Sequence, residues 1–142
     1  MLTEKDYCDY ETSVALKELG YKVPTSAYYM PNNNKLIFVS NSLRGGYVID
    51  CFRSHNSFPK EVMTSDYIDA PTMWEAQKWL REEKKVIVVI VPYTYNIITE
   101  TRTWTYEMWL EDNLEREVHD FKTYEEALSE GIKEAVKILK EK

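Results

Sequence analysis

The chain has 142 residues and a formal net charge of −6, and eleven tyrosines and four tryptophans supply most of its 13% aromatic residues. A chain of this length folds as one domain or two small ones, and it needs neither a disulfide nor a metal to support its core. Residues 1–65 carry equal numbers of acidic and basic side chains, so the whole net charge falls in residues 66–142. An acidic half argues against binding to nucleic acid, because such binding depends on lysine and arginine contacts with phosphates.

The two cysteines, Cys8 and Cys51, are far apart in the sequence, which favours two reduced thiols in a cytosolic protein. No apolar run reaches the roughly 18 residues that a membrane-spanning helix needs. The first residues are too polar for a secretory signal. We therefore expect a cytoplasmic protein that does not associate with membranes.

The first half begins with a predicted helix at about residues 9–19, with an earlier start at Thr3 as the alternative. Asp9 is a good N-cap, and Gly20 closes the segment as a C-terminal glycine does. Apolar residues recur between these two signals at helical spacing.

Two apolar stretches, 27–30 and 35–40, follow this helix and flank a Pro-Asn-Asn-Asn sequence at 31–34. Asparagine tolerates positive φ angles, so the pattern predicts a hairpin. Residues 47–50 are a candidate third strand. The polar residues 52–65 predict a long loop or the junction between two halves.

The second half opens with a helix signal, because Thr72 and Glu75 have the spacing of a capping box. This helix is predicted to run to about Glu83. Residues 86–91 are all apolar, which predicts a central strand covered on both faces. Pro92 lacks an N–H group, so strand pairing should loosen there.

Residues 96–101 are predicted to form a turn, and residues 102–110 alternate between large apolar and polar side chains like a half-buried strand. Residues 115–121 predict a short edge strand. Thr123 and Glu126 then repeat the capping signal and begin a last helix.

The last helix has an apolar stripe at helical spacing, made of Ala127, Leu128, Gly131, Ile132, Ala135, Ile138 and Leu139. Glycine inside a helix costs about 1 kcal/mol relative to alanine. We therefore expect Gly131 to mark a close approach between this helix and the sheet.

Few patterns point to catalysis or metal binding. Cys51 and His55 are four residues apart, but no second Cys/His cluster completes a zinc site, which needs three or four ligands. His119 lies beside Asp120, a pairing that could supply a general base and is equally typical of a solvated edge strand. We expect no enzyme activity, no metal and no cofactor, and we keep a small hydrolase or nuclease that uses His119 or His55 as a third hypothesis.

One basic stripe lies on the second predicted helix, beside Trp79, and consists of Lys78, Arg81, Lys84 and Lys85. One interpretation is a nucleic-acid contact that combines charge with stacking. The other is a solvated helix face whose last-turn cations complement the helix dipole. The overall acidity of the chain favours the second interpretation.

The surplus of aromatic residues, without converging polar chemistry, favours a protein contact surface. Tyrosine and tryptophan have an apolar body with a polar tip, and they are enriched among residues that dominate interfaces. Trp79, Tyr93 and Trp109 are the candidate contact residues. The partner is expected to be an unknown protein or a second copy of the chain in a homodimer.

Three segments carry a resemblance to a known group of proteins. They are Asp-Ala-Pro-Thr-Met-Trp-Glu-Ala-Gln-Lys-Trp-Leu-Arg-Glu-Glu at 69–83, the apolar and Trp/Tyr-rich strands after it, and Thr-Tyr-Glu-Glu-Ala-Leu-Ser-Glu-Gly-Ile-Lys-Glu-Ala-Val at 123–136. Together they resemble a family of small uncharacterised proteins from Bacteroides-type gut bacteria and their phages or prophages. The resemblance covers nearly the whole chain and implies a phage or prophage origin, but it implies no activity and no catalytic residues.

The element order from 72 to 140 also resembles the HicB-type antitoxins, whose small α/β module is related in shape to double-stranded-RNA-binding domains. Those RNA-binding domains place lysines at the start of the last helix. This chain has Glu125 and Glu126 there, and these carboxylates would repel phosphate. The resemblance therefore implies a shared module without RNA binding.

These observations predict an α+β protein in which an antiparallel sheet carries helices mainly on one face. The C-terminal half is expected to run helix-strand-strand-(strand)-helix, and the N-terminal half to form a helix plus a hairpin. Residues 1–142 are expected to form a single domain, within which 1–65 and 66–142 are candidate subregions. The leading functional hypothesis is an accessory protein of phage or mobile-element origin that acts by protein binding or self-association, and the alternative is a nucleic-acid-binding regulator of the antitoxin kind.

Overall fold

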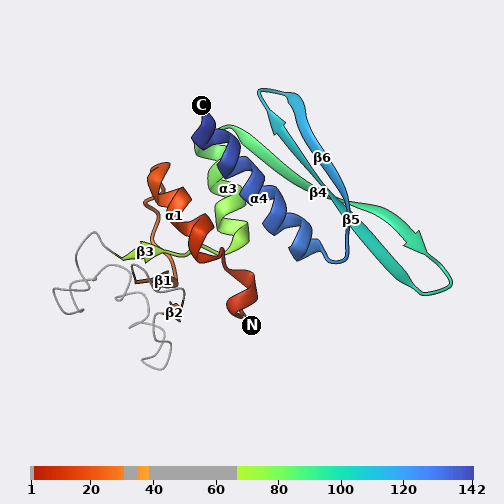
Figure 1. Cartoon of the computed structure of the whole chain (residues 1–142), viewed down its shortest axis with the longest axis horizontal. Helices are drawn as coiled ribbons and strands as arrows, with labels where there is room; N and C mark the ends of the chain where they lie inside the picture. Colours follow the sequence, from red (N-terminus) through yellow and green to blue (C-terminus); the bar gives the residue numbers. More distant parts are fainter. Residues whose placement is uncertain (1, 31–34, 39–66) are drawn as a thin grey trace. The chain divides into compact units, whose positions relative to one another are not determined.

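The computed structural model describes residues 2–30, 35–38 and 67–142 and separates into two compact units, Met1–Thr72 and Met73–Lys142. The described residues contain three α-helices and two three-stranded antiparallel sheets, so the predicted α+β class is confirmed (Figure 1). The predictions for 31–34, 47–50 and 52–65, and those for Cys51 and His55, fall outside the described residues.

The N-terminal unit begins with the short helix η1 (Glu4–Asp6) and the helix α1 (Tyr10–Glu18). Asp9 is the N-cap of α1, as predicted, and its carboxylate accepts a hydrogen bond of 2.8 Å from the N–H of Thr12. At the other end, Gly20 has a φ of 105° and its N–H donates to the carbonyl of Lys17, while the next residue donates to Leu16. This pair of bonds is the Schellman motif, which needs a residue that accepts positive φ.

The sheet of the N-terminal unit has the order β2-β1-β3, formed by β1 (Ala27–Tyr29), β2 (Leu36–Phe38) and β3 (Ile68–Asp69). The strands β1 and β2 are antiparallel neighbours, which confirms the predicted hairpin. Its core consists of Tyr7, Ala27, Tyr29, Leu36, Ile68 and Ala70, with Tyr10 and Val14 of α1 packed against it.

The C-terminal unit comprises α3 (Met73–Glu83), β4 (Val86–Asn96), β5 (Thr101–Leu110), β6 (Asn113–Phe121) and α4 (Tyr124–Glu141). Its sheet has the order β4-β5-β6 with antiparallel neighbours. The helices α3 and α4 lie together along one part of this sheet, as Figure 1 shows. The predicted turn at 96–101 and the predicted edge strand at 115–121 are both confirmed, although β6 is longer than expected.

The helix α4 packs on the sheet through small and branched side chains. Thr123 is its N-cap, as predicted, and the Thr123 hydroxyl accepts a hydrogen bond of 3.0 Å from the N–H of Glu126. Arg116 of β6 pairs with Glu134 of α4 at 2.9 Å, and so fixes the helix above the third strand. The buried residues of α4 are Ala127, Leu128, Gly131, Ile132, Ala135 and Val136.

The prediction that 86–91 form a central strand covered on both faces is wrong. Among the described strands, β4 lies at an edge and β5 is central. Val86 and Val88 are buried, but Ile87 between them is 38% exposed. The strand is apolar on both faces because one face packs against the helices while the other contributes to an apolar surface, and the sequence pattern alone cannot separate these two situations.

The free edge of β4 is covered where it passes α3. The side-chain amide of Gln77 donates a hydrogen bond of 2.7 Å to the backbone carbonyl of Val88. An uncovered edge strand offers its backbone groups to other chains. Gln77 therefore occupies part of the edge that a further strand would need.

Candidate functional site

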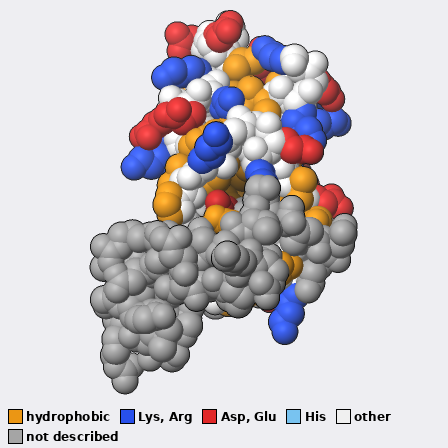
Figure 2. Space-filling model, turned by 90° about the vertical axis from the view of Figure 1, so that its left-hand side faces the viewer, with side chains coloured by type: hydrophobic (Ala, Val, Ile, Leu, Met, Phe, Trp, Pro, Cys, Tyr) orange, Lys and Arg blue, Asp and Glu red, His pale blue; other side chains and the backbone are white. Residues whose placement is uncertain are grey.

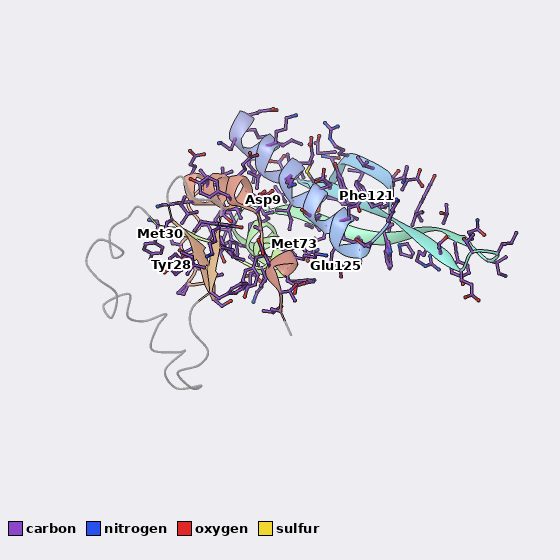
Figure 3. All side chains as sticks on the ribbon, turned by 60° about the horizontal axis from the view of Figure 1, so that its bottom comes forward. Asp9, Tyr28, Met30, Met73, Phe121 and Glu125 are labelled. Carbon is purple, nitrogen blue, oxygen red and sulfur yellow. The ribbon has the colours of Figure 1, made fainter. Side chains whose placement is uncertain are left out.

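The strands β4 and β5 extend beyond β6 as a two-stranded hairpin. The pairing of β6 with β5 ends at Phe121, opposite Trp104, so residues 92–103 have no third strand beside them among the described residues. We call residues 92–103 the arm. Figure 1 shows it extending away from α3 and α4, and Figure 3 shows the side chains that stand along it beyond Phe121.

A β-bulge lies at the base of the arm, directly after Pro92, where the sequence predicts that strand pairing loosens. Pro92 faces Trp104 and Tyr95 faces Arg102, so two residues of β4 stand opposite one residue of β5. The hydroxyls of Thr94 and Thr103 are 2.6 Å apart and join the two strands across this irregularity. Such bulges increase the local twist and change the direction of the side chains that follow.

The tip of the arm presents two isoleucines to solvent. The side-chain carbonyl of Asn96 accepts hydrogen bonds from the N–H groups of Ile98 and Thr99, at 2.9 and 3.2 Å, which fixes the turn. Ile97 is 80% exposed and Ile98 is 88% exposed. Polar residues usually occupy turns, so an exposed isoleucine pair at this place points to a contact surface.

The sheet of the C-terminal unit has one face against α4 and one face turned away from it. The backbone of Gly131 in α4 approaches Val88 and Tyr106, which places these two residues on the helix-covered face. Because side chains alternate along a strand and paired residues share a face, the neighbouring positions point the other way. We call this other side the open face, and it contains Ile87, Val89, Val91, Tyr93, Thr105, Glu107, Trp109, Leu114, Glu117 and His119.

An apolar row crosses the open face. Ile87 of β4 is paired with Trp109 of β5, and Trp109 is paired with Leu114 of β6. Ile87 and Leu114 are 38% and 46% exposed, and Trp109 is half-buried between them. Val89 and Val91 continue the apolar surface from this row toward the arm.

Two carboxylates lie beside this apolar row. Glu107 of β5 is directly paired with Glu117 of β6. The indole N–H of Trp109 donates to Glu107 at 3.2 Å, and Nε2 of His119 lies 3.4 Å from Glu117. The open face therefore combines an acidic centre with an apolar border.

His119 is held in place by three neighbours. Its Nδ1 lies 2.7 Å from the hydroxyl of Thr105, and its Nε2 faces Glu117. Its ring is stacked on Tyr93, with 4.2 Å between centroids and 13° between the planes. Tyr93, at the base of the arm, is therefore fixed against β6.

Glu117, His119 and Thr105 form a chain of three groups: a carboxylate, an imidazole and a hydroxyl. Many hydrolases use the same sequence of groups to activate a nucleophile. A nucleophile has to reach its substrate, but Thr105 is only 1% exposed and lies beneath the imidazole. Among the described residues, no group of three His, Cys, Asp or Glu side chains could hold a metal ion. The arrangement orients an imidazole and an aromatic ring, and it presents no attacking hydroxyl.

Two of the three predicted contact residues, Tyr93 and Trp109, lie on the open face. Trp79 lies on α3, where it is half-buried and the ammonium of Lys84 is 5.5 Å from the centre of its ring. Ile87, Leu114 and the isoleucine pair at the tip are not among the contact residues predicted from the sequence. The signal for that pair was present, because two adjacent isoleucines are unusual in a turn.

Two residues of the predicted basic stripe, Lys78 and Arg81, lie on α3, whereas Lys84 and Lys85 follow its last residue, Glu83. Lys78, Arg81 and Lys85 are exposed, and the ammonium of Lys85 donates to the carbonyl of Glu82 at 2.9 Å. On the coloured part of the face drawn in Figure 2, acidic and basic side chains are mixed. A nucleic-acid contact through this stripe stays a prediction.

The N-terminal unit contains an open pocket of about 310 Å³ lined by Lys17, Tyr21, Lys22, Tyr67 and Asp69. The ammonium of Lys17 donates to the carbonyl of Tyr67 at 2.9 Å. Burial, together with the nearby charge of Asp69, raises the pKa of Tyr67. The pocket mixes both signs of charge with two aromatic rings, so its lining favours no particular ligand chemistry.

No protein-family model matches the chain, and neither a curated protein nor a solved structure is significantly similar to it. The resemblances to the Bacteroides and phage family and to the HicB-type antitoxins therefore stay predictions. None of the helices in the described ranges is long and apolar enough to cross a membrane.

Proposed function

We propose that the protein is a non-enzymatic accessory protein that acts by binding another protein, and that the open face and the arm form its docking surface. The observation that carries this proposal is a set of apolar side chains within reach of solvent, namely Ile87, half-buried Trp109 and Leu114 on the open face and the isoleucine pair at the tip of the arm. Monomeric soluble proteins rarely expose large contiguous apolar patches, and such patches commonly mark interaction sites.

The spread of apolar side chains over three strands and the arm agrees with a protein partner better than with a small ligand. Fully burying one isoleucine side chain contributes about 1.5–3 kcal/mol, whereas association itself costs roughly 4–15 kcal/mol. The two isoleucines at the tip would not overcome this cost alone. The apolar row and the arm together offer more apolar side chains for burial than the tip alone.

Two aromatic residues of the docking surface, Tyr93 and Trp109, are held in place by contacts within the protein. Tyr93 is stacked on His119, and the indole of Trp109 is hydrogen-bonded to Glu107. Side chains that are ordered before binding lose less conformational entropy when the complex forms. Tyrosine and tryptophan are also enriched among the residues that dominate binding energy.

The edges of the sheet favour docking through side chains over the addition of a further strand. Gln77 occupies the carbonyl of Val88 on the edge of β4, and Pro92 has no N–H to offer further along it. The opposite edge, β6, carries charged side chains at Glu115, Arg116 and Glu117. Charged residues, proline and covered backbone groups all discourage strand addition.

The test is a quantitative pull-down from the native host that compares wild-type protein with Trp109→Ala and Leu114→Ser, followed by affinity measurement with the recovered partner. Removing a tryptophan anchor typically costs about 2 kcal/mol or more, which corresponds to roughly a thirtyfold weaker complex. Lys137→Ala, on the exposed side of α4, is the matched control and should bind like wild type. Equal recovery by folded Trp109→Ala and Leu114→Ser proteins would overturn the proposal.

A further inference from the structure

The centre of the open face holds two acidic residues at paired strand positions. Glu107 and Glu117 are directly paired across β5 and β6. The Cβ atoms of such a pair are about 4.5–5.5 Å apart, and like charges at this separation destabilise a sheet. Functional sites often contain residues that lower stability, so the simplest explanation of this pair is a role in binding a partner.

The two carboxylates lack a cationic partner of full charge within the unit. Glu107 accepts from the neutral indole of Trp109, and Glu117 faces His119, which is charged only when protonated. Among the described residues, no lysine or arginine lies within ion-pair distance of either carboxylate. The pair therefore forms a negative centre between the apolar row and the stacked Tyr93 and His119 rings.

We infer that the open face binds a protein segment that places an arginine or lysine side chain over Glu107 and Glu117, with apolar side chains on either side. This inference rests on the proposed docking function and names the chemistry of the partner. The guanidinium of an arginine can bond both carboxylates and stack on the indole of Trp109. The apolar neighbours of that cation would contact Ile87 and Leu114 on one side, and Val89 and Val91 on the other.

The negative charge of Glu107 and Glu117 argues against a second copy of the chain, nucleic acid or anionic lipid as the molecule that binds this face. A second copy docked about a two-fold axis through the centre of the open face would bring its own carboxylate pair against the first, because a two-fold interface uses the same patch on both subunits. Nucleic acid and anionic lipid would meet the same repulsion. A cationic segment is the occupant that the charge pattern complements.

The experiment selects binders from a phage-displayed library of random peptides on immobilised full-length protein, and then measures the affinity of the selected synthetic peptides. We expect the peptides to be enriched in arginine or lysine with apolar neighbours. The variant Glu107→Gln with Glu117→Gln should bind them about tenfold more weakly or worse, because a close charge pair is lost. Their affinity for wild-type protein should also fall as salt concentration rises.

The matched control is the variant Glu83→Gln with Glu141→Gln, which changes the net charge equally at two exposed helix positions and should bind like wild type. Peptides that depend on Trp109 and Leu114 but contain no enriched cation would overturn this inference and leave the proposed function standing. Peptides indifferent to Trp109→Ala and Leu114→Ser, or no enrichment at all, would count against both. A concentration-dependent dimer in sedimentation analysis that Trp109→Ala abolishes would assign the face to a second copy and also overturn the inference.

Discussion

A Cβ atom added to Gly131 of α4 would lie 2.6 Å from Cγ1 of Val88 in β4, so the helix and the sheet touch where no methyl group fits. The same atom would lie 3.2 Å from Cγ of Tyr106 in β5. This contact sets how closely α4 lies on the sheet. It also identifies the face of the sheet that α4 covers, so Trp109 and the carboxylate pair belong to the other face.

Gly131→Ala should destabilise the protein. Alanine gains about 1 kcal/mol of helix propensity over glycine, but overpacking a close contact typically costs about 1–3 kcal/mol. We expect the contact to dominate, because the obstructing atoms belong to a buried valine and a buried tyrosine. The measurement is the free energy of unfolding in urea.

The double variant Gly131→Ala with Val88→Ala tests the cause of that loss. If the clash with Val88 is responsible, the two substitutions should destabilise the protein by less than the sum of their separate effects. Lys137→Ala, on the exposed side of the same helix, should leave the stability nearly unchanged. A Gly131→Ala protein more stable than wild type would show that the helix moves away from the sheet without penalty.

Thr123→Ala should weaken the start of α4. The Thr123 hydroxyl accepts the N–H of Glu126 at 3.0 Å, and loss of such an N-cap costs about 1 kcal/mol. Thr123→Ser keeps the accepting oxygen and should stay within a few tenths of a kcal/mol of wild type. Thermal unfolding followed by circular dichroism measures both variants, and equal destabilisation by alanine and serine would contradict the capping explanation.

Local signals in the sequence predicted the fold well, because each acts over a few residues. Asp9 and Thr123 cap their helices, Gly20 adopts a positive φ, and Pro92 coincides with an irregularity in pairing. The burial of 86–91 was not predictable in the same way. It depends on which strand is central and on which face the helices cover, and both are properties of the assembled sheet.

The candidate site was only partly predictable from the sequence. Tyr93 and Trp109 were named because aromatic residues are common anchors, and both lie on the open face. Glu107 and Glu117 were not named as a pair, because their proximity arises from the register of β5 with β6, which includes a shift between Met108 and Trp109. A one-residue change in register would move every side chain of β6 to the other face.

The stability of the protein should decline in alkaline solution through buried tyrosines. Burial, with smaller contributions from the charges of Asp9, Cys8 and Glu4, raises the pKa of Tyr29 from 10.0 to about 12. The unfolded chain therefore ionises first as the pH rises, so the stabilising contribution is complete below the unfolded pKa and is lost as the pH rises from about 10 to 12. Urea unfolding at a series of alkaline pH values measures this decline.

Tyr29→Phe should reduce the loss of stability that occurs as the pH rises from about 10 to 12. The variant loses the ionisable group, and also the hydrogen bond of 3.0 Å from the Tyr29 hydroxyl to the carbonyl of Cys8, so it should be less stable than wild type at neutral pH. Some decline should persist, because burial also raises the pKa values of Tyr28 and Tyr106. A pH dependence as steep as that of wild type would contradict the role of Tyr29.

Gln77→Ala should uncover the edge of β4. The lost bond to the carbonyl of Val88 should cost about 1 kcal/mol, as for a typical hydrogen bond. The exposed edge should also raise the tendency of the protein to associate at high concentration, because free edge strands pair with other chains. Light scattering and urea unfolding measure the two effects, and unchanged association in a destabilised variant would show that Gln77 contributes stability alone.

Replacing the isoleucines at the tip should separate binding from stability. Ile97 and Ile98 are 80% and 88% exposed, so Ile97→Ser with Ile98→Ser removes almost no buried surface, and surface changes of this kind stay within about 0.5 kcal/mol. Partner binding should weaken, because the variant loses two apolar groups that would be buried in the complex. The matched control is Thr99→Ser, which keeps a hydroxyl in the same turn. A tip variant that binds the partner as tightly as wild type would restrict the docking surface to the open face, and a large loss of stability would mean that the isoleucines pack within the protein itself.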